Sequence, residues 1–282
     1  MLKIHVLSEN TSCSADFGSE HGLSLWIHGD QTDVNGLKGN LLFDTGASEL
    51  FSVNATAMGL NLNDVDLAVV SHGHYDHGGG LKAFLALNDH AKIYIRKSGF
   101  EDHYALRKET DHVYIGIDQA LASDSRFVFC DAHEEIKPGI EVFSEVSGER
   151  FLPSGNHVLL ERRGEAFVPD DFRHEQNLIL EKDGRSYLIA GCAHTGILNI
   201  IDRFRVIKGH MPDVVIGGFH LYNRAGHQSE PDEKTEALGR ELMKTGAMFY
   251  TCHCTGLQAY DVLKGVMGER IAYLSAGTEI TV

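Results

Sequence analysis

Cysteine is scarce in this chain of 282 residues, which contains only five. The five are Cys13, Cys130, Cys192, Cys252 and Cys254, an odd and sparse set for a chain of this length. Secreted proteins that depend on disulfides use denser and even-numbered sets, so a disulfide framework is excluded as the basis of this fold. A reduced setting is the simplest explanation, and we therefore expect a cytoplasmic protein.

Long apolar runs are also lacking, although 43% of the residues are hydrophobic. No uninterrupted apolar stretch reaches the roughly 20 residues that cross a bilayer as a helix. Residues 1–7, MLKIHVL, read as a strand and lack the apolar core of about 7–15 residues that a signal peptide requires. We expect no membrane association, and the length and hydrophobic content favour one large domain with a sizeable core.

Basic residues are few relative to acidic ones, with 25 Lys and Arg against 40 Asp and Glu and a formal net charge of -15. Extended contacts with nucleic acids or anionic membranes rely on clusters of Lys and Arg, and here only pairs such as Arg162 and Arg163 occur. We expect no nucleic-acid partner. A small anionic substrate remains compatible with this charge, because bound cations supply their own positive charge. The sequence indicates no oligomeric state.

Histidine, in contrast, is abundant, with 17 residues, and one segment concentrates it. Residues 71–80 read SHGHYDHGGG, which places the potential metal ligands His72, His74, Asp76 and His77 within six positions. The preceding residues 66–70 form an apolar, β-branched run typical of a buried strand. Residues 81–87 are rich in helix formers, so the ligands lie on a strand-to-helix loop held from both sides.

Imidazole and carboxylate are the ligands that zinc, manganese and iron accept in proteins. Four ligands on one loop exceed what one tetrahedral ion needs once distant ligands join, so we expect two ions. A turn that is histidine-rich by chance is disfavoured, because a buried strand precedes it and three glycines follow.

The HxHxDH pattern at 72–77 resembles the signature of the metallo-β-lactamase superfamily. The segment NLLFDTG at 40–46 resembles the strand and turn that precede the signature in that superfamily. Three segments resemble one subgroup of that superfamily more narrowly, namely GCAHTG at 191–196, GGFHL at 217–221 and HCTG at 253–256. That subgroup includes the dihydropterin-methyl ribofuranosylaminobenzene phosphate synthases and bacterial relatives. The resemblance implies an α/β fold, a four-layer αββα sandwich, in one domain over 1–282.

The resemblance also implies a ligand set for two divalent metal ions, with zinc expected and manganese or iron as alternatives. His72, His74 and one later residue are expected to hold the first ion, and Asp76, His77 and His253 the second. His194 is the leading candidate for the later ligand, since it follows a strand end where the superfamily places such residues.

Four further residues are candidates for a role at the metal site. Cys192 stands where many relatives have a bridging Asp, so it is either a ligand that favours zinc or a small buried residue. His174 and Glu175 are reserve ligands. Asp44 resembles an acid that orients the histidine loop through hydrogen bonds, although an Asp that begins a turn fits as well.

Substrate contacts are expected beyond the ligands. Asp76 is a candidate for orienting water, and His220 follows a strand and two glycines, which suits acid/base work or a structural histidine equally. Thr255, with the amides that open the helix after it, is a candidate for binding an anionic oxygen. His21 is either a site residue or an ordinary surface histidine.

Hydrophobic periodicity predicts the remaining elements. Strands are expected at 3–7, 24–28, 41–43, 66–70, 92–95, 139–143, 158–161, 177–181, 186–190, 213–218 and 272–278, and helices at 51–58, 81–87, from 195, at 234–245 and at 257–266. Residues 96–135 lose this periodicity, which favours an insertion or lid over the site, with a pair of solvated helices as the alternative. In this region Arg96, Lys97, Arg107 and Lys108 are equal candidates for contacting an anion.

Three functions compete. The first, which we favour, is a metal-dependent hydrolase that activates water against a small ester, lactone or phosphate-bearing substrate. The second follows from the subgroup, namely a transferase that joins a dihydropterin-methyl diphosphate to an aminobenzene ribose phosphate and releases pyrophosphate. The third is a metal or ligand sensor without catalysis, which the intact ligand set disfavours.

Overall fold

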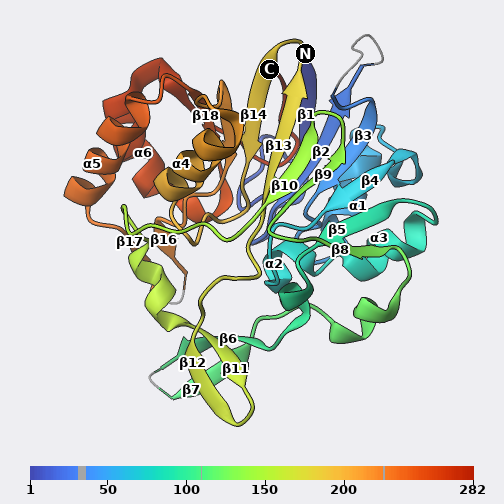
Figure 1. The fold of residues 1–282 in the computed structure, drawn as a ribbon, viewed down its shortest axis with the longest axis horizontal. Helices are drawn as coiled ribbons and strands as arrows, with labels where there is room; N and C mark the ends of the chain where they lie inside the picture. The colour runs from blue at the N-terminus through green and yellow to red at the C-terminus, as the bar shows by residue number, and fades with distance from the viewer. Residues whose placement is uncertain (31–35, 109, 225) are drawn as a thin grey trace.

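Two large β-sheets form the centre of the molecule in the computed structural model, which describes residues 1–30, 36–108, 110–224 and 226–282 (Figure 1). The first sheet has the strand order β20 (Glu279–Thr281), β1 (Leu2–Ser8), β2 (Ser24–Gly29), β3 (Gly39–Phe43), β4 (Leu67–Val69), β5 (Lys92–Ile95) and β8 (Phe127–Phe129). The second has the order β19 (Ile271–Tyr273), β18 (Met248–Thr251), β15 (Val214–Gly217), β14 (Arg185–Ile189), β13 (Asn177–Lys182), β10 (Ile140–Phe143) and β9 (His133–Lys137).

Helices cover the outer face of each sheet (Figure 1). On the first sheet lie α1 (Leu50–Ala57) and α3 (Leu81–Leu87), and the one-turn helix α2 (Tyr75–Gly78) lies at the sheet edge. On the second lie α4 (Ile197–Lys208), α5 (Asp232–Met243) and α6 (Leu257–Met267). Short 3-10 helices connect several elements, namely η1 (Leu62–Asp64), η2 (Lys97–Phe100), η3 (Gln119–Ser123), η4 (Ser154–Val158), η5 (His253–Thr255) and η6 (Gly268–Arg270).

Three apolar cores follow from this layering. The central one lies between the sheets and contains side chains from both, such as Ile27 of β2 and Leu180 of β13. Phe51 and Phe84 pack the helices onto the first sheet, and Phe204 packs α4 onto the second. Each side chain of this size contributes about 1.5–3 kcal/mol when buried, so both helical layers are held mainly by the hydrophobic effect. The predicted four-layer αββα sandwich is confirmed.

Residues 96–135 do not form the alternative pair of helices. They contain β6 (His103–Arg107) and β7 (Asp111–Tyr114), which pair with β11 (Leu159–Arg163) and β12 (Ala166–Pro169) in a separate four-stranded sheet with the order β12, β11, β6, β7. This small sheet lies below the two large ones in Figure 1. The predicted strand at 158–161 therefore exists, but it belongs to this sheet.

The predicted strand at 272–278 is wrong in its second half. β19 ends at Tyr273, and Gly277 turns the chain at a φ of 84° before β20 begins. A further small hairpin, β16 (Tyr222–Asn223) and β17 (Gln228–Ser229), was not predicted. In the described part of the chain, we find no helix with the length and apolar character needed to span a membrane.

The strand directions bring the chemical motifs together. β3, β4 and β5 are parallel to one another, and so are β14, β15 and β18. The carboxyl ends of the strands in each set therefore lie at the same end of their sheet. The loops after these strands carry every histidine motif of the sequence. Gln176, directly before β13, links the two sheets through hydrogen bonds to the residues after β4. Its backbone N–H donates to the Ser71 carbonyl over 2.7 Å, and its side chain donates to the Val70 carbonyl over 2.8 Å.

Candidate metal centre

Backbone strain recurs where these loops leave the strands. Asp44, Ala193, His220 and His253 all have left-handed φ angles, of 58°, 55°, 48° and 52°. Non-glycine residues adopt this region at an energetic cost of about 1–3 kcal/mol and are retained where the surroundings enforce it. The four residues come from four separate strand ends and converge on one place, which marks it as a functional site.

Asp44 fixes the hydrogen positions of two histidine rings. Its Oδ1 accepts the backbone N–H of Ser71 over 2.7 Å, and its Oδ2 accepts both the Ser71 hydroxyl at 2.7 Å and Nδ1 of His77 at 2.6 Å. Since the Ser71 hydroxyl donates to Asp44, it accepts from Nδ1 of His72, 2.9 Å away. Both rings therefore carry a hydrogen on Nδ1 and direct Nε2 into the site, which is the orienting role predicted for Asp44.

Two asparagines impose the same orientation on the distant histidines. The Asn156 amide donates to the His194 carbonyl over 2.8 Å, and its oxygen lies 3.2 Å from Nδ1 of His194. Asn10 contacts His253 in the same way. Its amide nitrogen donates to the His253 carbonyl over 3.2 Å, and its amide oxygen lies 2.9 Å from Nδ1 of His253. Nδ1 is again the donor in each ring, so Nε2 of each is left with a lone pair that points into the site.

The inward nitrogens have no satisfactory protein partners. Nε2 of His72 and Nε2 of His194 are buried without any hydrogen bond. Nε2 of His77 lies 3.2 Å from Nε2 of His253 and 3.0 Å from Sγ of Cys192. Buried lone pairs that face each other are unfavourable unless a cation or a proton lies between them. Ligands held at about 2.0–2.3 Å from one zinc ion have a similar mutual spacing, so the donor set fits a bound metal.

Several groups of donor atoms lie here, each with its atoms within 4.8 Å of one another, and one of them consists of Cys192, His220 and Cys254. Two further groups match the expected ligand sets. His72, Cys192 and His194 form one, and His74 approaches it in a further group with His72 and Asp76. The second group contains Asp76, His77, Cys192 and His253. Cys192 is buried, as one of its two interpretations requires, and its sulfur belongs to both groups, as the other requires.

The electrostatics suit cation binding. Burial lowers the pKa of His72 and of His194 well below the ordinary value, so both rings are neutral. Burial acts to raise the pKa of Asp76, but His77, His21 and His253 outweigh it and hold the pKa well below its usual range. Burial would likewise lower the pKa of His77, but Asp44 and Asp76 raise it to about 9. In the metal-free chain His77 is therefore protonated, and an ion that binds there displaces that proton.

Glu175 and His174, the two reserve candidates for metal ligands, make hydrogen bonds to the backbone of the loops that carry the other candidates. Glu175 accepts the backbone N–H of His194 over 2.6 Å and that of Thr195 over 3.0 Å, which fixes the loop that carries His194. His174 accepts the backbone N–H of Gly73 at Nδ1 over 2.9 Å. Thr255 is fully buried, and its hydroxyl lies 2.6 Å from that of Thr251, so its position gives no support to a substrate contact.

A cavity opens beside the two groups. His21, which the sequence left undecided, lines it and places Nε2 3.2 Å from Oδ2 of Asp76. His220 also lines it, with its ring 4.2 Å from that of His194 and its Nδ1 buried without a partner. Of the four basic candidates in 96–108, only Arg107 lines the cavity, together with Arg224, which the sequence did not single out.

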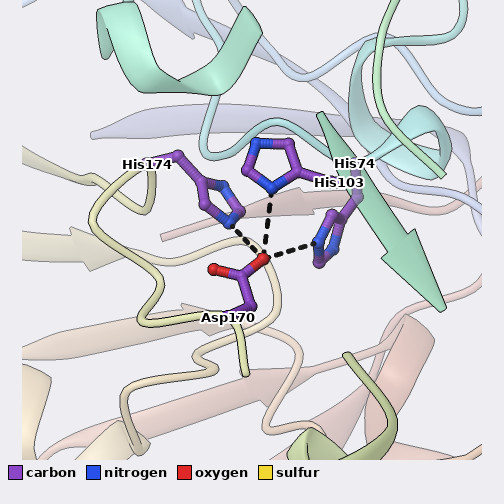
Figure 2. Close-up of side chains that lie close together, drawn as sticks. All are labelled: His74, His103, Asp170 and His174. Atoms are coloured by element: carbon purple, nitrogen blue, oxygen red, sulfur yellow. Dashed lines mark hydrogen bonds and ion pairs between the residues drawn. The ribbon is translucent and has the colours of Figure 1, made fainter. Parts of the chain in front are cut away.

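Sequence reasoning missed the residues that support the ligands from behind. Asn156 has no recognisable motif, and neither do His103 and Asp170, which lie buried beside His74 (Figure 2). Their only common signal is that they are polar residues with apolar or strand-like neighbours. That signal does not distinguish them from ordinary surface positions.

Comparisons with known proteins agree with this geometry. The family model described as the metallo-beta-lactamase superfamily matches residues 34–204. A 7,8-dihydropterin-6-methyl-4-(beta-D-ribofuranosyl)-aminobenzene-5'-phosphate synthase from Methanocaldococcus jannaschii is 27% identical, over 98% of this chain and 95% of the relative. The crystal structure of Tm1679, a metal-dependent hydrolase of the β-lactamase superfamily, is 29% identical with a TM-score of 0.81, over 100% of this chain and 99% of that one. Zn(2+)-bound PqqB from Methylobacterium extorquens shares the fold at 10% identity, with a TM-score of 0.56, over 99% of this chain and 100% of that one.

Proposed function

Because this chain belongs to the metallo-β-lactamase superfamily, as the motif at 72–77 predicted, we propose that it is a metal-dependent hydrolase with two divalent ions at one site. Members of this superfamily are generally enzymes. The observation that carries the proposal is the common orientation of four imidazole rings, each tied outward through Nδ1 with Nε2 directed at shared space. Two of these nitrogens, Nε2 of His72 and Nε2 of His194, are buried without a hydrogen bond, and those of His77 and His253 face each other at 3.2 Å, an arrangement that a histidine needed only for packing would not require.

His72, His74 and His194 would hold the first ion, and Asp76, His77 and His253 the second. The sulfur of Cys192 lies within 4.8 Å of donor atoms of both sets, which supports it as a further ligand. Imidazole with one thiolate favours zinc over manganese or iron. Two ions held in this way polarise an ester or phosphate oxygen and lower the pKa of water when they are bound.

The chain's own residues would complete the reaction. Asp76 is placed to orient the attacking water, since its carboxylate lies at the cavity and within 3.3 Å of Nε2 of His253. His220 is placed to move a proton at the leaving group, because its Nδ1 has no protein partner and its ring lines the cavity. Acid/base groups of this kind contribute roughly 10²–10⁴-fold to a rate.

We propose a small anionic substrate. Arg107 from β6 and Arg224 after β16 both line the cavity, and Arg224 donates to the Tyr75 hydroxyl over 3.1 Å, which holds it there. Apolar residues such as Ile115 and Leu159 also line the cavity. A ligand with an apolar or aromatic body and one phosphate or carboxylate matches this lining.

A second function has a specific observation in its favour. The 27% identity to a synthase extends over 98% of this chain, so the transferase reaction implied by the subgroup is the alternative. In that case the same ions would bind the diphosphate group that leaves. Pyrophosphate would then appear only when both the dihydropterin-methyl diphosphate and the aminobenzene ribose phosphate are supplied.

The test is an activity screen on metal-free protein before and after zinc is restored. Phosphodiesters, phosphomonoesters and lactones are assayed, with the two transferase substrates in parallel. Asp76→Asn is compared with Asp89→Asn, an exposed control that pairs with His90 on the surface. We expect zinc-dependent turnover that Asp76→Asn lowers at least ~100-fold and Asp89→Asn leaves intact. Tight zinc binding without any turnover would contradict the proposal and favour a sensor.

A further inference from the structure

A second cluster of buried side chains shares His74 with the metal centre (Figure 2). Oδ2 of Asp170 faces three imidazoles, at 3.1 Å from Nδ1 of His103, 3.2 Å from Nε2 of His174 and 3.9 Å from Nε2 of His74. None of these four side chains is more than 5% exposed. Only His74 belongs to the ligand set, so the cluster lies outside the site already described.

The surrounding backbone determines where the hydrogens lie. The N–H of Gly73 donates to Nδ1 of His174, so the hydrogen of that ring is on Nε2 and is donated to Asp170. The ring of His103 lies between two acceptors, with Nε2 at 3.1 Å from the Ser98 carbonyl and Nδ1 facing Asp170. Each nitrogen of His103 faces an oxygen acceptor, so Nδ1 is in position to donate to Asp170. Asp170 thus receives hydrogen bonds from two sides.

This arrangement argues against a third ion in the cluster, although its four donor atoms lie close enough together to hold one. A metal ligand must offer a lone pair, and Nε2 of His174 has none as long as the Gly73 amide occupies Nδ1. The hydrogens on His174 and His103 both point toward the centre of the cluster, where an ion would have to be. The cluster is therefore a hydrogen-bond centre around one carboxylate.

The consequence concerns the ring of His74. Its Nε2 faces Asp170 and is buried without a hydrogen bond, which leaves Nδ1 for the ion, in contrast to the Nε2 used by the other four histidines. An ion bound at Nδ1 requires the hydrogen to be on Nε2, where it can be donated to Asp170. A carboxylate behind a metal-bound imidazole fixes the ring and raises its basicity.

We propose that Asp170 is a positioning residue of the metal centre, which orients His74 directly and holds Gly73 through His174. Gly73 lies between the two loop ligands of the first ion, so both contacts act on the same loop. His103 begins β6, and Asp170 directly follows β12, so the small sheet acts as part of the support of the first ion. This inference rests on the proposed metal centre.

The experiment measures metal affinity rather than turnover. Metal-free protein is titrated with Zn²⁺ in competition with a chromophoric chelator, and Co²⁺ spectra identify each ion. In Asp170→Asn, whose amide hydrogens would oppose the imidazole donors, we expect one ion to bind roughly 10- to 100-fold more weakly and the other to change less than about twofold. The site that binds more weakly in Asp170→Asn should be the site whose Co²⁺ spectrum is lost in His74→Asn.

Asp171→Asn is the matched control, because Asp171 is adjacent, half-exposed and paired with Arg163 on the surface. It should bind both ions as the unaltered chain does. If Asp170→Asn does not fold, His103→Asn decides the matter. Its shorter side chain reaches only one of the two acceptors, so the same ion should weaken by roughly 3- to 10-fold.

Unchanged affinity for both ions in a folded Asp170→Asn or His103→Asn variant overturns this inference and leaves the metal centre intact. Three ions in the unaltered chain, with the third lost in Asp170→Asn, would overturn it as well, because the cluster would then be an ion site. An unaltered chain that binds no zinc at all refutes the proposed function together with this inference.

Discussion

At the scale of single residues, the site depends on which ring nitrogen each histidine directs inward. The HxHxDH segment predicts His72, His74, Asp76 and His77 as ligands, because four metal-binding side chains in six positions are hard to explain otherwise, and the structure includes all four in groups of close donor atoms. It could not predict ring orientation, since the groups that set it come from distant positions. Asn156 is an example, as it contacts His194 across 38 positions of the chain.

Cys192 is the residue whose role can be tested most sharply. Its sulfur lies 3.0 Å from Nε2 of His77 and belongs to both donor groups. Burial raises the pKa of its thiol well above the usual value, so without an ion the group stays protonated. We predict that Co²⁺-loaded protein shows a thiolate-to-cobalt band in the near ultraviolet and that Cys192→Ser abolishes it.

Cys130→Ser is the control for this prediction, because Cys130 is also buried but lies away from both donor groups. The band should persist in that variant. A band of equal intensity in Cys192→Ser would contradict the prediction and show that another cysteine, such as Cys254, supplies the thiolate.

Arg107 tests the choice of an anionic substrate. It lines the cavity, and no hydrogen bond or ion pair to another described residue occupies its guanidinium. For any substrate found to carry a phosphate or carboxylate, we predict that Arg107→Gln raises KM by roughly 10-fold or more, since charged hydrogen bonds contribute about 1.5–3 kcal/mol. kcat should change less.

Lys108→Gln provides the comparison, since Lys108 is the neighbouring cation and does not line the cavity. Its KM should stay within about twofold of the unaltered value. Equal effects of the two substitutions would mean that only the overall charge of the region matters.

At the scale of elements, the sequence predicted what is local and missed what is not. Strand-then-helix patterns located β4 and α3, because a buried run and a run of helix formers are both visible in the residues themselves. The pairing of β6 with β11 joins residues more than 50 positions apart and leaves no local pattern. For that reason the small sheet, and with it the role of Asp170, could be found only in the structure.

Attachment of α4 to the second sheet gives a prediction for stability against pH. Glu141 of β10 accepts from Lys208 of α4 over 2.7 Å, with His133 of β9 at 2.7 Å. Burial would raise the pKa of Glu141, but Lys208 and His133 lower it below its ordinary value of 4.5. A carboxyl with a lowered pKa stabilises the fold above its unfolded value and loses that effect as the pH falls through its folded value.

We therefore predict that Glu141→Gln lowers the free energy of unfolding by about 1–3 kcal/mol at pH 7 and that the difference disappears progressively below pH 4.5. Urea denaturation at a series of pH values measures it, with the exposed Glu165→Gln as control. A loss that is the same at pH 7 and at pH 3 would show that the packing of the side chain, rather than its charge, is responsible.

At the scale of the whole molecule, the donor groups join the two halves of the chain. His72, Asp76 and His77 follow β4 of the first sheet, whereas Cys192, His194 and His253 follow strands of the second. Each proposed ion therefore has ligands from both sheets and would hold the two inner layers together at one edge. The four-layer fold was predictable from motif resemblance, since it is a property of the family.

Metal removal should consequently destabilise the whole domain. Free zinc at about 100 times its dissociation constant stabilises a folded protein by about 2.7 kcal/mol per site. For a domain of this size we predict that zinc raises Tm by roughly 5–10 °C above that of the metal-free protein. Calorimetry with and without a chelator measures the shift. A Tm that does not change when zinc is added would contradict the proposal that each ion has ligands from both sheets.

The number of ions bound per chain tests the central claim most directly. Metal-free protein is reconstituted with zinc, freed of excess metal, and analysed for metal and protein together. Two zinc ions per chain, reduced to one in His253→Asn, are the result that the convergence of two donor groups predicts. One ion or none in the unaltered chain would contradict the account.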